Sequence, residues 1–267
     1  MVDESERQYH LEVAPGDVAE TVLLPGDPDR VDVVTDRWDD AETVATHREY
    51  RTATGTYEDA PLSVTSTGIG SPSAAIAVEE LARVGAETFL RVGSCGAIHP
   101  EISVGDLVIT TGAVRGEGTS KEYVRPEYPA VADHAVVSAL VAAAERLGYD
   151  YHCGITLSTD SFYAGQARPG FEGFEAPGSG SLLDDLRAAN VKNIEMEASA
   201  VLTLANLYGL RAGEVCTAFA NRTTGEFRTE GEGRAAEVGS LAAALLHRMG
   251  ERRETADAGA WHADLSL

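Results

Sequence analysis

Arginines set beside glycine turns or inside apolar runs are the residues of this sequence that most directly suggest chemistry. In Leu24–Arg30 (LPGDPDR) a Gly-Asp-Pro turn precedes an arginine, an arrangement that can present backbone N–H groups and a guanidinium to one anion. Arg91 lies in the apolar run 89–92, where an unpaired guanidinium would cost several kcal/mol. Because Gly-Ser-Cys-Gly (93–96) follows, the pattern indicates an oxyanion site at the end of a strand. An ordinary turn and a structural ion pair are the alternatives.

Carboxylates and planar amide groups form a second set of candidates. Glu195 and Glu197 flank Met196 at the start of a predicted helix. Carboxylates there suit the helix dipole, and they could also accept hydrogen bonds from a sugar diol above an apolar methionine.

The segment 160–168 (DSFYAGQAR) combines an aromatic ring with planar donors and an acceptor. Phe162 offers a face for stacking, while Gln166 and Arg168 can match the O=C–NH–C=O edge of a base. Together with the arginines and carboxylates, these residues supply what a nucleoside and inorganic phosphate would need.

Alternating apolar runs and amphipathic segments must position these residues. We expect a strand at 88–92 that stops at the glycines of 93–96, and a helix in which Ser71 is the N-cap and Pro72 the first residue. The long segment 165–180 is expected to be a functional loop. The other predicted strands are 21–25, 61–67, 106–110, 151–158 and 212–220, and the predicted helices are 73–84, 130–147, 182–190, 197–208 and 234–252.

This order predicts one α/β domain over residues 1–267, with a mixed sheet that helices cover on both faces. Its core is expected to span about residues 9–252, and residues 254–267 are expected to fray. We find no linker between two halves and no internal repeat.

Charge and composition exclude several classes of protein. Acidic residues outnumber basic ones by 43 to 21, for a net charge of −22, which disfavours nucleic-acid and anionic-membrane partners. The glycines spell neither a P-loop nor a dinucleotide fingerprint. The scattered Cys95, Cys153 and Cys216 predict neither a disulfide framework nor a zinc site.

The surface composition and the N-terminal sequence bear on location. Lys121 and Lys192 are the only lysines, and such an acidic, lysine-poor composition predicts a salt-rich cytosol. The polar N-terminus is not a secretory signal, and no apolar run reaches the roughly 18 residues of a membrane span. We therefore expect a cytoplasmic protein.

Long ordered strings connect these segments to a known family. The chain resembles the trimeric and hexameric nucleoside phosphorylases, most closely their uridine phosphorylase branch, from about Tyr9 to Arg252. The resemblance implies a distorted, barrel-like sheet and a pentosyltransferase that needs no cofactor and takes inorganic phosphate as co-substrate. It also implies a homohexamer built as a trimer of dimers. The matching strings are VLLPGDPDRV, HREY, STGIGSPSAAIAVEELARVGAETFLRVGSCGAI, VGDLVITTGAVR, YPAVAD, TDSFYAGQAR, NIEMEASA and NRT.

The resemblance assigns a role to each candidate residue. The phosphate ligands would be Gly26, Arg30, Arg91 and Ser94, with Arg48 supplied by a neighbouring subunit. The ribose would be bound by Glu195, Met196, Glu197 and, across the dimer, His10, and the base by Phe162, Gln166, Arg168, Phe219 and Arg222. The catalytic residues would be Arg91, Gln166 and Arg168. A monovalent cation such as potassium would be held by Glu49, Ile69 and Ser73.

Two departures from the family pattern bear on the base. Alanines at 218 and 220 flank Phe219 and could admit a purine, and the sequence after Arg168 differs from the expected lid. Purine enzymes of this type use an aspartate where Asn221 stands, so uridine is the favoured substrate and a 6-oxopurine nucleoside such as guanosine or inosine is the alternative. A nucleosidase that uses water and a non-catalytic nucleoside-binding protein are less favoured.

Overall fold

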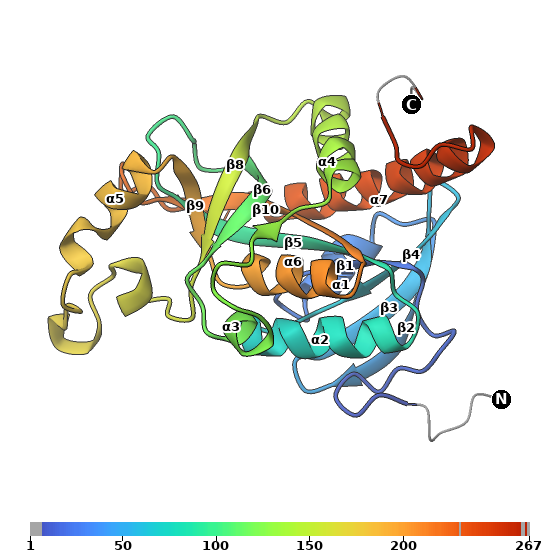
Figure 1. The fold of residues 1–267 in the computed structure, drawn as a ribbon, viewed down its shortest axis with the longest axis horizontal. Coiled ribbons are helices and arrows are strands. Elements are labelled where there is room, and N and C mark those ends of the chain that lie inside the picture. The colour runs from blue at the N-terminus through green and yellow to red at the C-terminus, as the bar shows by residue number, and fades with distance from the viewer. Residues whose placement is uncertain (1–6, 230, 263–264, 266–267) are drawn as a thin grey trace.

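A mixed β-sheet forms the centre of the protein (Figure 1), in a computed structural model that describes residues 7–229, 231–262 and 265. Within the described residues the sheet order is β10, β6, β8, β9, β5, β1, β4, β3, β2, and β7 pairs with β6. The strands are β1 (Thr21–Leu24), β2 (Asp40–His47), β3 (Tyr50–Tyr57), β4 (Ala60–Thr65), β5 (Thr88–Ala97), β6 (Leu107–Arg115), β7 (Ala130–Val131), β8 (Tyr151–Ser158), β9 (Val191–Glu195) and β10 (Arg211–Asn221).

Strand β5 closes part of this sheet into a barrel. It pairs in parallel with β10 along its whole length, while its last residues, Gly96 and Ala97, pair with β9. Strands β5, β10, β6, β8 and β9 therefore form a ring. The first half of β5 also pairs with β1, which continues the sheet into β4, β3 and β2. The predicted barrel-like mixed sheet is confirmed.

Helices cover both faces of the sheet, as predicted (Figure 1). Apolar side chains of α1, α4 and α7 share one buried cluster, and those of α2 and α6 share another. The helices are α1 (Arg30–Thr35), α2 (Ser71–Arg83), α3 (Thr119–Tyr123), α4 (His134–Leu147), α5 (Leu182–Ala188), α6 (Ala198–Leu207) and α7 (Glu232–Thr255), and the 3₁₀ turns are η2 (Ala164–Gln166), η3 (Phe171–Gly173) and η4 (Ser179–Ser181).

Local sequence explains where α4 begins and ends. The carboxylate of Asp133 accepts hydrogen bonds from the backbone N–H groups of Ala135 and Val136 at 2.9 and 3.1 Å. Gly148 ends the helix with a φ of 70°, a conformation that glycine adopts without a steric penalty. The helix is four residues shorter than predicted, because residues 130–131 pair with β6 and Asp133 is the N-cap.

Two predicted boundaries are wrong near the cavity described below. Gly93–Gly96 do not stop β5, because β10 supplies parallel backbone partners through Ala97. Ser71 is not the N-cap of α2: the cap residue is Gly70, with a φ of 97°, and the Ser71 hydroxyl donates to the Met196 carbonyl at 2.7 Å. The Ser71 side chain thus ties α2 to the turn before α6 instead of closing its own helix.

Several segments went unpredicted or lie differently from their prediction. The hairpin of β2 and β3 and helix α1 were not predicted. The expected loop 165–180 contains the short turn η3 and parts of the turns η2 and η4. In the region expected to fray, α7 continues to Thr255, and the Trp261 carbonyl lies 3.1 Å from His134 Nε2. Residues 263–264 and 266–267 of that region lie outside the described residues. No helix in the described part of the chain is long and apolar enough to cross a membrane.

Candidate active site

The predicted site residues gather around one cavity of about 740 Å³. Its walls come from the β1–α1 turn, the end of β5, the loop after β8, the β9–α6 junction and the end of β10. The predicted residues that line it are Gly26, Arg30, Glu49, Ile69, Ser73, Arg91, Ser94, Phe162, Gln166, Arg168, Glu195, Met196, Glu197 and Phe219. Candidates for phosphate, sugar and base therefore meet in a single hollow.

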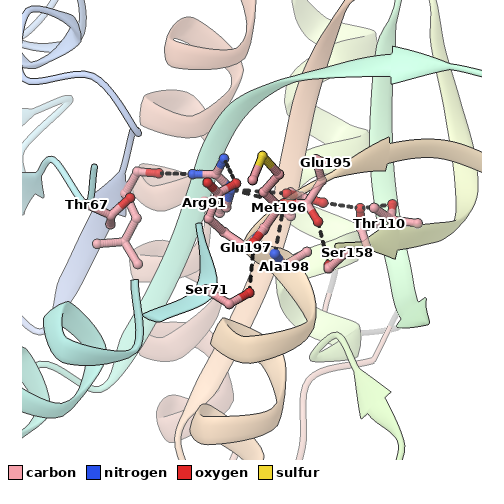
Figure 2. Close-up of polar contacts among 12 residues, drawn as sticks. Thr67, Ser71, Arg91, Thr110, Ser158, Glu195, Met196, Glu197 and Ala198 are labelled. Atoms are coloured by element: carbon pink, nitrogen blue, oxygen red, sulfur yellow. Dashed lines mark hydrogen bonds and ion pairs between the residues drawn. The ribbon is translucent and has the colours of Figure 1, made fainter. Parts of the chain in front are cut away.

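Arg91 is the centre of a buried ion-pair cluster (Figure 2). Its Nη2 donates to Glu197 Oε2, and its Nε lies 3.4 Å from Glu195 Oε2. A third carboxylate, that of Glu214, lies 3.3 Å from the same Nε. Only about 5% of the Arg91 surface is exposed, so the low dielectric strengthens these interactions. Arg91 thus satisfies the expectation that its guanidinium is paired.

Glu195 and Glu197 are fixed by backbone as well as by Arg91. The N–H groups of Glu197 and Ala198 donate to Glu195 Oε2 at 2.7 and 2.9 Å, and the Ser158 hydroxyl donates to Oε1. The Gly70 N–H donates to Glu197 Oε1. These contacts join the start of α2 to the start of α6, so both carboxylates have defined positions.

Burial changes the titration of both carboxyls. Desolvation and, to a lesser extent, the nearby Glu214 raise the pKa of Glu195 to about 7, against the lowering effect of Arg91. Desolvation also raises the pKa of Glu197 to about 7, against the lowering effect of Arg91. The carboxylates surround Arg91 closely, and their attraction raises the pKa of its guanidinium despite burial. The pair therefore changes charge near neutral pH, as is common at functional sites.

The loop after β8 presents the predicted base-reading groups. Arg168 Cζ lies 4.3 Å from the centre of the Phe162 ring, a cation–π contact. Gln166 is buried, and Arg168 Nε is buried without a hydrogen-bond partner within the described chain. Burial also lowers the pKa of Arg168. An N–H group left without a partner in a cavity wall is suited to an acceptor on a ligand.

Close backbone approaches shape the phosphate end of the cavity. The Gly68 N–H donates to the Gly26 carbonyl at 2.8 Å, and a Cβ on Gly26 would lie 3.2 Å from the Gly68 oxygen. A Cβ on Gly93 would lie 2.9 Å from Cys216 Sγ and 3.2 Å from Arg91 Nη2. Glycine is therefore required at 93 for the Arg91 side chain to reach its position. Arg30 Cζ lies 5.5 Å from the Phe219 ring centre on the same wall.

Three predicted site residues lie outside the cavity walls. His10 Nδ1 lies 2.6 Å from Glu80 Oε1, and Arg48 Cζ lies 5.7 Å from the ring centre of the exposed Tyr9. Arg222 lies behind the base loop: its Nη1 donates to the Gln166 carbonyl at 2.8 Å and its Nη2 to the Ala167 carbonyl at 3.3 Å. Within one chain, these side chains do not complete the cavity.

The candidate cation residues adjoin one another. Gly68 packs against Glu49, since a Cβ there would lie 2.9 Å from Glu49 Cγ. The Ser73 hydroxyl donates to the Ile69 carbonyl at 3.3 Å and to the Gly70 carbonyl at 3.1 Å. The carboxylate, carbonyl and hydroxyl oxygens of these residues are the donors that a hard cation uses, so the donor chemistry fits.

Two residues at the site were missed by sequence reasoning. Phe227 lines the cavity and forms a β-bridge with Ala220, but it lies in a weakly patterned segment that gave no signal. Glu214 lies in the predicted strand 212–220, among apolar residues. That is the same signal that singled out Arg91, because a charge inside an apolar strand requires a partner.

Comparison with known proteins agrees with the fold. The phosphorylase superfamily model matches residues 20–250, and the chain belongs to this family. A uridine phosphorylase of Thermococcus kodakarensis is 59% identical over 97% of this chain and 94% of its own length. A guanosine phosphorylase of Halorubrum lacusprofundi is 48% identical over 82% of this chain and 86% of its own. A uridine phosphorylase of Escherichia coli is 42% identical over 82% of this chain and 87% of its own length.

Proposed function

We propose that this protein is a pentosyltransferase that cleaves uridine with inorganic phosphate to give uracil and ribose 1-phosphate. The observation that carries the proposal is the cavity itself. It brings Arg91, the carboxylate of Glu197 and the edge-reading pair Gln166 and Arg168 into one hollow. The 59% identity to a uridine phosphorylase over nearly the whole chain supports the same substrate.

The proposed reaction needs positioning and charge rather than an attacking side chain. A phosphate oxygen forms the bond to C1′ from the face opposite the base, and the N-glycosidic bond breaks with its electron pair leaving on the base. Arg30 and Arg91 would hold the phosphate dianion, and Glu197 would accept hydrogen bonds from the ribose hydroxyls. Gln166 and Arg168 would donate to the uracil oxygens and stabilise the departing anion. A proton from solvent then neutralises the uracil.

The environment of Asn221 favours a pyrimidine over a 6-oxopurine. Its amide Nδ2 donates to the carbonyls of His99 and Ile102 at 2.9 and 2.8 Å. Its Oδ1 accepts from the N–H groups of Thr223 and Thr224 at 2.8 and 3.0 Å. The whole amide is therefore used to shape the turn after β10, and it does not line the cavity. A purine N7 would find no donor from this residue.

A guanosine phosphorylase remains the second candidate because of the cavity wall. Ala220 and the exposed Phe227 line the cavity on the β10 side, where the small alanine side chain leaves room for a larger base. The 48% identity to a guanosine phosphorylase points in the same direction.

A phosphorolysis screen tests the proposal. Uridine, thymidine, deoxyuridine, inosine, guanosine and adenosine are assayed at molar potassium chloride, with and without phosphate. We expect uridine to be cleaved only with phosphate, releasing ribose 1-phosphate. Guanosine cleavage without uridine cleavage would establish the second candidate, and free ribose without phosphate would establish a nucleosidase.

We propose further that the working site is completed by a second copy of the chain. Arg48 is exposed and His10 lies outside the cavity, so each would act in the site of a neighbouring subunit within a trimer of dimers. Mixing tests this arrangement. Arg48→Ala and Gln166→Ala subunits, each inactive alone, should regain activity in mixed oligomers, because some sites then contain both intact halves.

We also propose a monovalent cation at Glu49, Ile69 and Ser73, shared between two copies. The cation is not a co-substrate, because phosphate is the only co-substrate in this proposal. A salt-rich cytoplasm would supply potassium for the cation site. Replacing potassium chloride by choline chloride at equal ionic strength should then lower activity, and Ser73→Ala should remove the difference between the two salts.

A further inference from the structure

Four residues form one row across four neighbouring strands behind the cavity. Arg91 on β5 is in register with Leu24 on β1 and with Glu214 on β10. Glu214 is in turn in register with Thr110 on β6. Glu214 is fully buried, and it is absent from the cavity wall that the described residues form. It therefore acts on the site through its neighbours, Glu195 and Arg91, whose Nε lies 3.3 Å from Glu214 Oε1.

The charges around Arg91 do not balance if every carboxyl is ionised. One guanidinium faces the carboxyls of Glu195, Glu197 and Glu214, all of them buried. Three negative charges against one positive charge, away from water, are strongly unfavourable. A proton on one of the carboxyls lowers this excess from two negative charges to one.

A chain of hydrogen bonds indicates which carboxyl holds the proton. Asn193 Oδ1 accepts from the Thr156 hydroxyl at 2.8 Å, which uses the single proton of that hydroxyl. The contact of 2.6 Å between the hydroxyls of Thr156 and Thr110 then requires the proton of Thr110. Thr110 Oγ1 donates to Glu214 Oε2 if Glu214 is ionised; if the Thr110 proton instead goes to Thr156, this contact requires a proton on Glu214. The reversed Asn193 amide would reverse the chain, but the excess of negative charge favours the first direction.

We propose, on the basis of the phosphorolysis above, that Glu214 is a positioning residue for phosphate: a neutral carboxylic acid that supports Arg91 from behind. As a neutral group it contacts Arg91 Nε at 3.3 Å without cancelling the positive charge that attracts the phosphate dianion. If it ionised, a further negative charge next to Arg91 would oppose the phosphate.

The surroundings of Glu214 keep it neutral. Desolvation raises its pKa well above the ordinary value and Cys216 adds to the rise, while Arg91 and any hydrogen bond donated to it by Thr110 or Glu195 lower the pKa. Among the described residues the titratable or charged groups that face it are Arg91 from β5, Glu195 from β9 and Cys216 from β10 itself. The phosphate dianion favours the protonated form, so by linkage phosphate binding weakens as pH rises through the pKa of Glu214.

The first test is the pH dependence of the KM for phosphate in Glu214→Gln, which stays neutral at every pH. The ratio of the wild-type KM to the variant KM should rise about tenfold as pH increases through the pKa of Glu214, because one added charge near a dianion costs that order of affinity. The ratio of the wild-type to the variant KM for uridine should not change with pH. Glu117→Gln is the matched control, since Glu117 is also fully buried and, among the described residues, accepts hydrogen bonds from Ser120 and Ser199.

A second measurement does not require turnover. The infrared difference between wild type and Glu214→Met, which has similar length but no acid, should show a protonated carboxyl band at pH 7 that disappears at high pH. If the wild-type protein did not cleave uridine with phosphate, the proposed function would be refuted, but the protonated carboxyl band would still be observed. The absence of the band at pH 7, or parallel phosphate KM profiles in wild type and Glu214→Gln, would overturn the role of Glu214.

Discussion

Arg222 and Gln166 are joined by a hydrogen bond of 2.8 Å from the Arg222 Nη1 group to the Gln166 carbonyl oxygen. Arg222 also donates to the next carbonyl, that of Ala167, which has a positive φ of 51°. The arginine predicted to contact the base thus holds the backbone of the loop that carries Gln166 and Arg168. The end of β10 and the loop after β8 are coupled through this side chain.

Replacing Arg222 should therefore loosen the base loop and leave the phosphate end unchanged. Arg222→Ala removes two hydrogen bonds from a charged donor, so we expect the uridine KM to rise about tenfold or more. The phosphate KM should change less than about twofold. Steady-state kinetics with each substrate varied in turn measures both values. Arg187→Ala is the control, because Arg187 lies near the same loop but pairs with Asp184 and Thr223 on the surface. Equal effects on both KM values would contradict the assignment.

Substitutions at Arg91 and Arg48 should distinguish an effect on stability from an effect on activity. Arg91→Met leaves three buried carboxyls without their cation, and we expect the free energy of unfolding to fall by about 3–5 kcal/mol. Arg48→Ala changes an exposed side chain, so its stability should remain within about 0.5 kcal/mol of wild type while turnover is lost. Denaturant unfolding and phosphorolysis are measured on both variants. An active Arg48→Ala protein would contradict the phosphate site completed by a second subunit.

Activity should rise with pH around neutrality because the raised pKa values of Glu195 and Glu197 lie at about 7. Ionised Glu197 is the better acceptor for ribose hydroxyls, so kcat/KM for uridine should increase through an apparent pKa that belongs to the coupled pair. Glu195→Gln should move this midpoint to lower pH, since the charge of Glu195 raises the pKa of Glu197. A profile that is flat between pH 6 and 8 would contradict the assignment.

The same shifts have a stability consequence of defined sign. The folded carboxyls bind protons more tightly than unfolded ones, whose pKa is near 4.5. Their contribution to stability is therefore greatest below about pH 4.5 and is lost as pH rises toward 7. Unfolding measured across this range should show a smaller decline in Glu195→Gln, which cannot titrate at that position.

Stability should increase with salt because the net charge is −22. Raising the ionic strength shortens the Debye length to about 3 Å at 1 M and weakens self-repulsion. We expect the melting temperature to rise in potassium chloride and in choline chloride alike. A rise in potassium chloride only would instead identify a bound cation. No rise in either salt would contradict the inferred adaptation to a salt-rich cytosol.

Local pattern was sufficient for most of the fold, and local pattern together with the family resemblance was sufficient for most of the cavity lining. Fourteen predicted site residues line the cavity because short, specific strings such as those around Gly26 and Arg168 are each set on one turn or loop. The β2–β3 hairpin, by contrast, went unpredicted because its strands have few buried residues and weak alternation. The continuation of β5 through Gly93 depends on a partner strand about 120 residues later, which no local window contains.

The sequence by itself determined which chemical groups are present: arginines for an anion, two carboxylates at a helix start and a planar pair beside an aromatic ring. Only the tertiary structure decided how they combine. It placed Glu214 in register with Arg91, gave Arg222 to the loop backbone instead of the cavity and turned the Asn221 amide toward backbone partners. The local sequence gives the side-chain types, but charge balance and hydrogen-bond satisfaction depend on residues that meet only when distant strands pair.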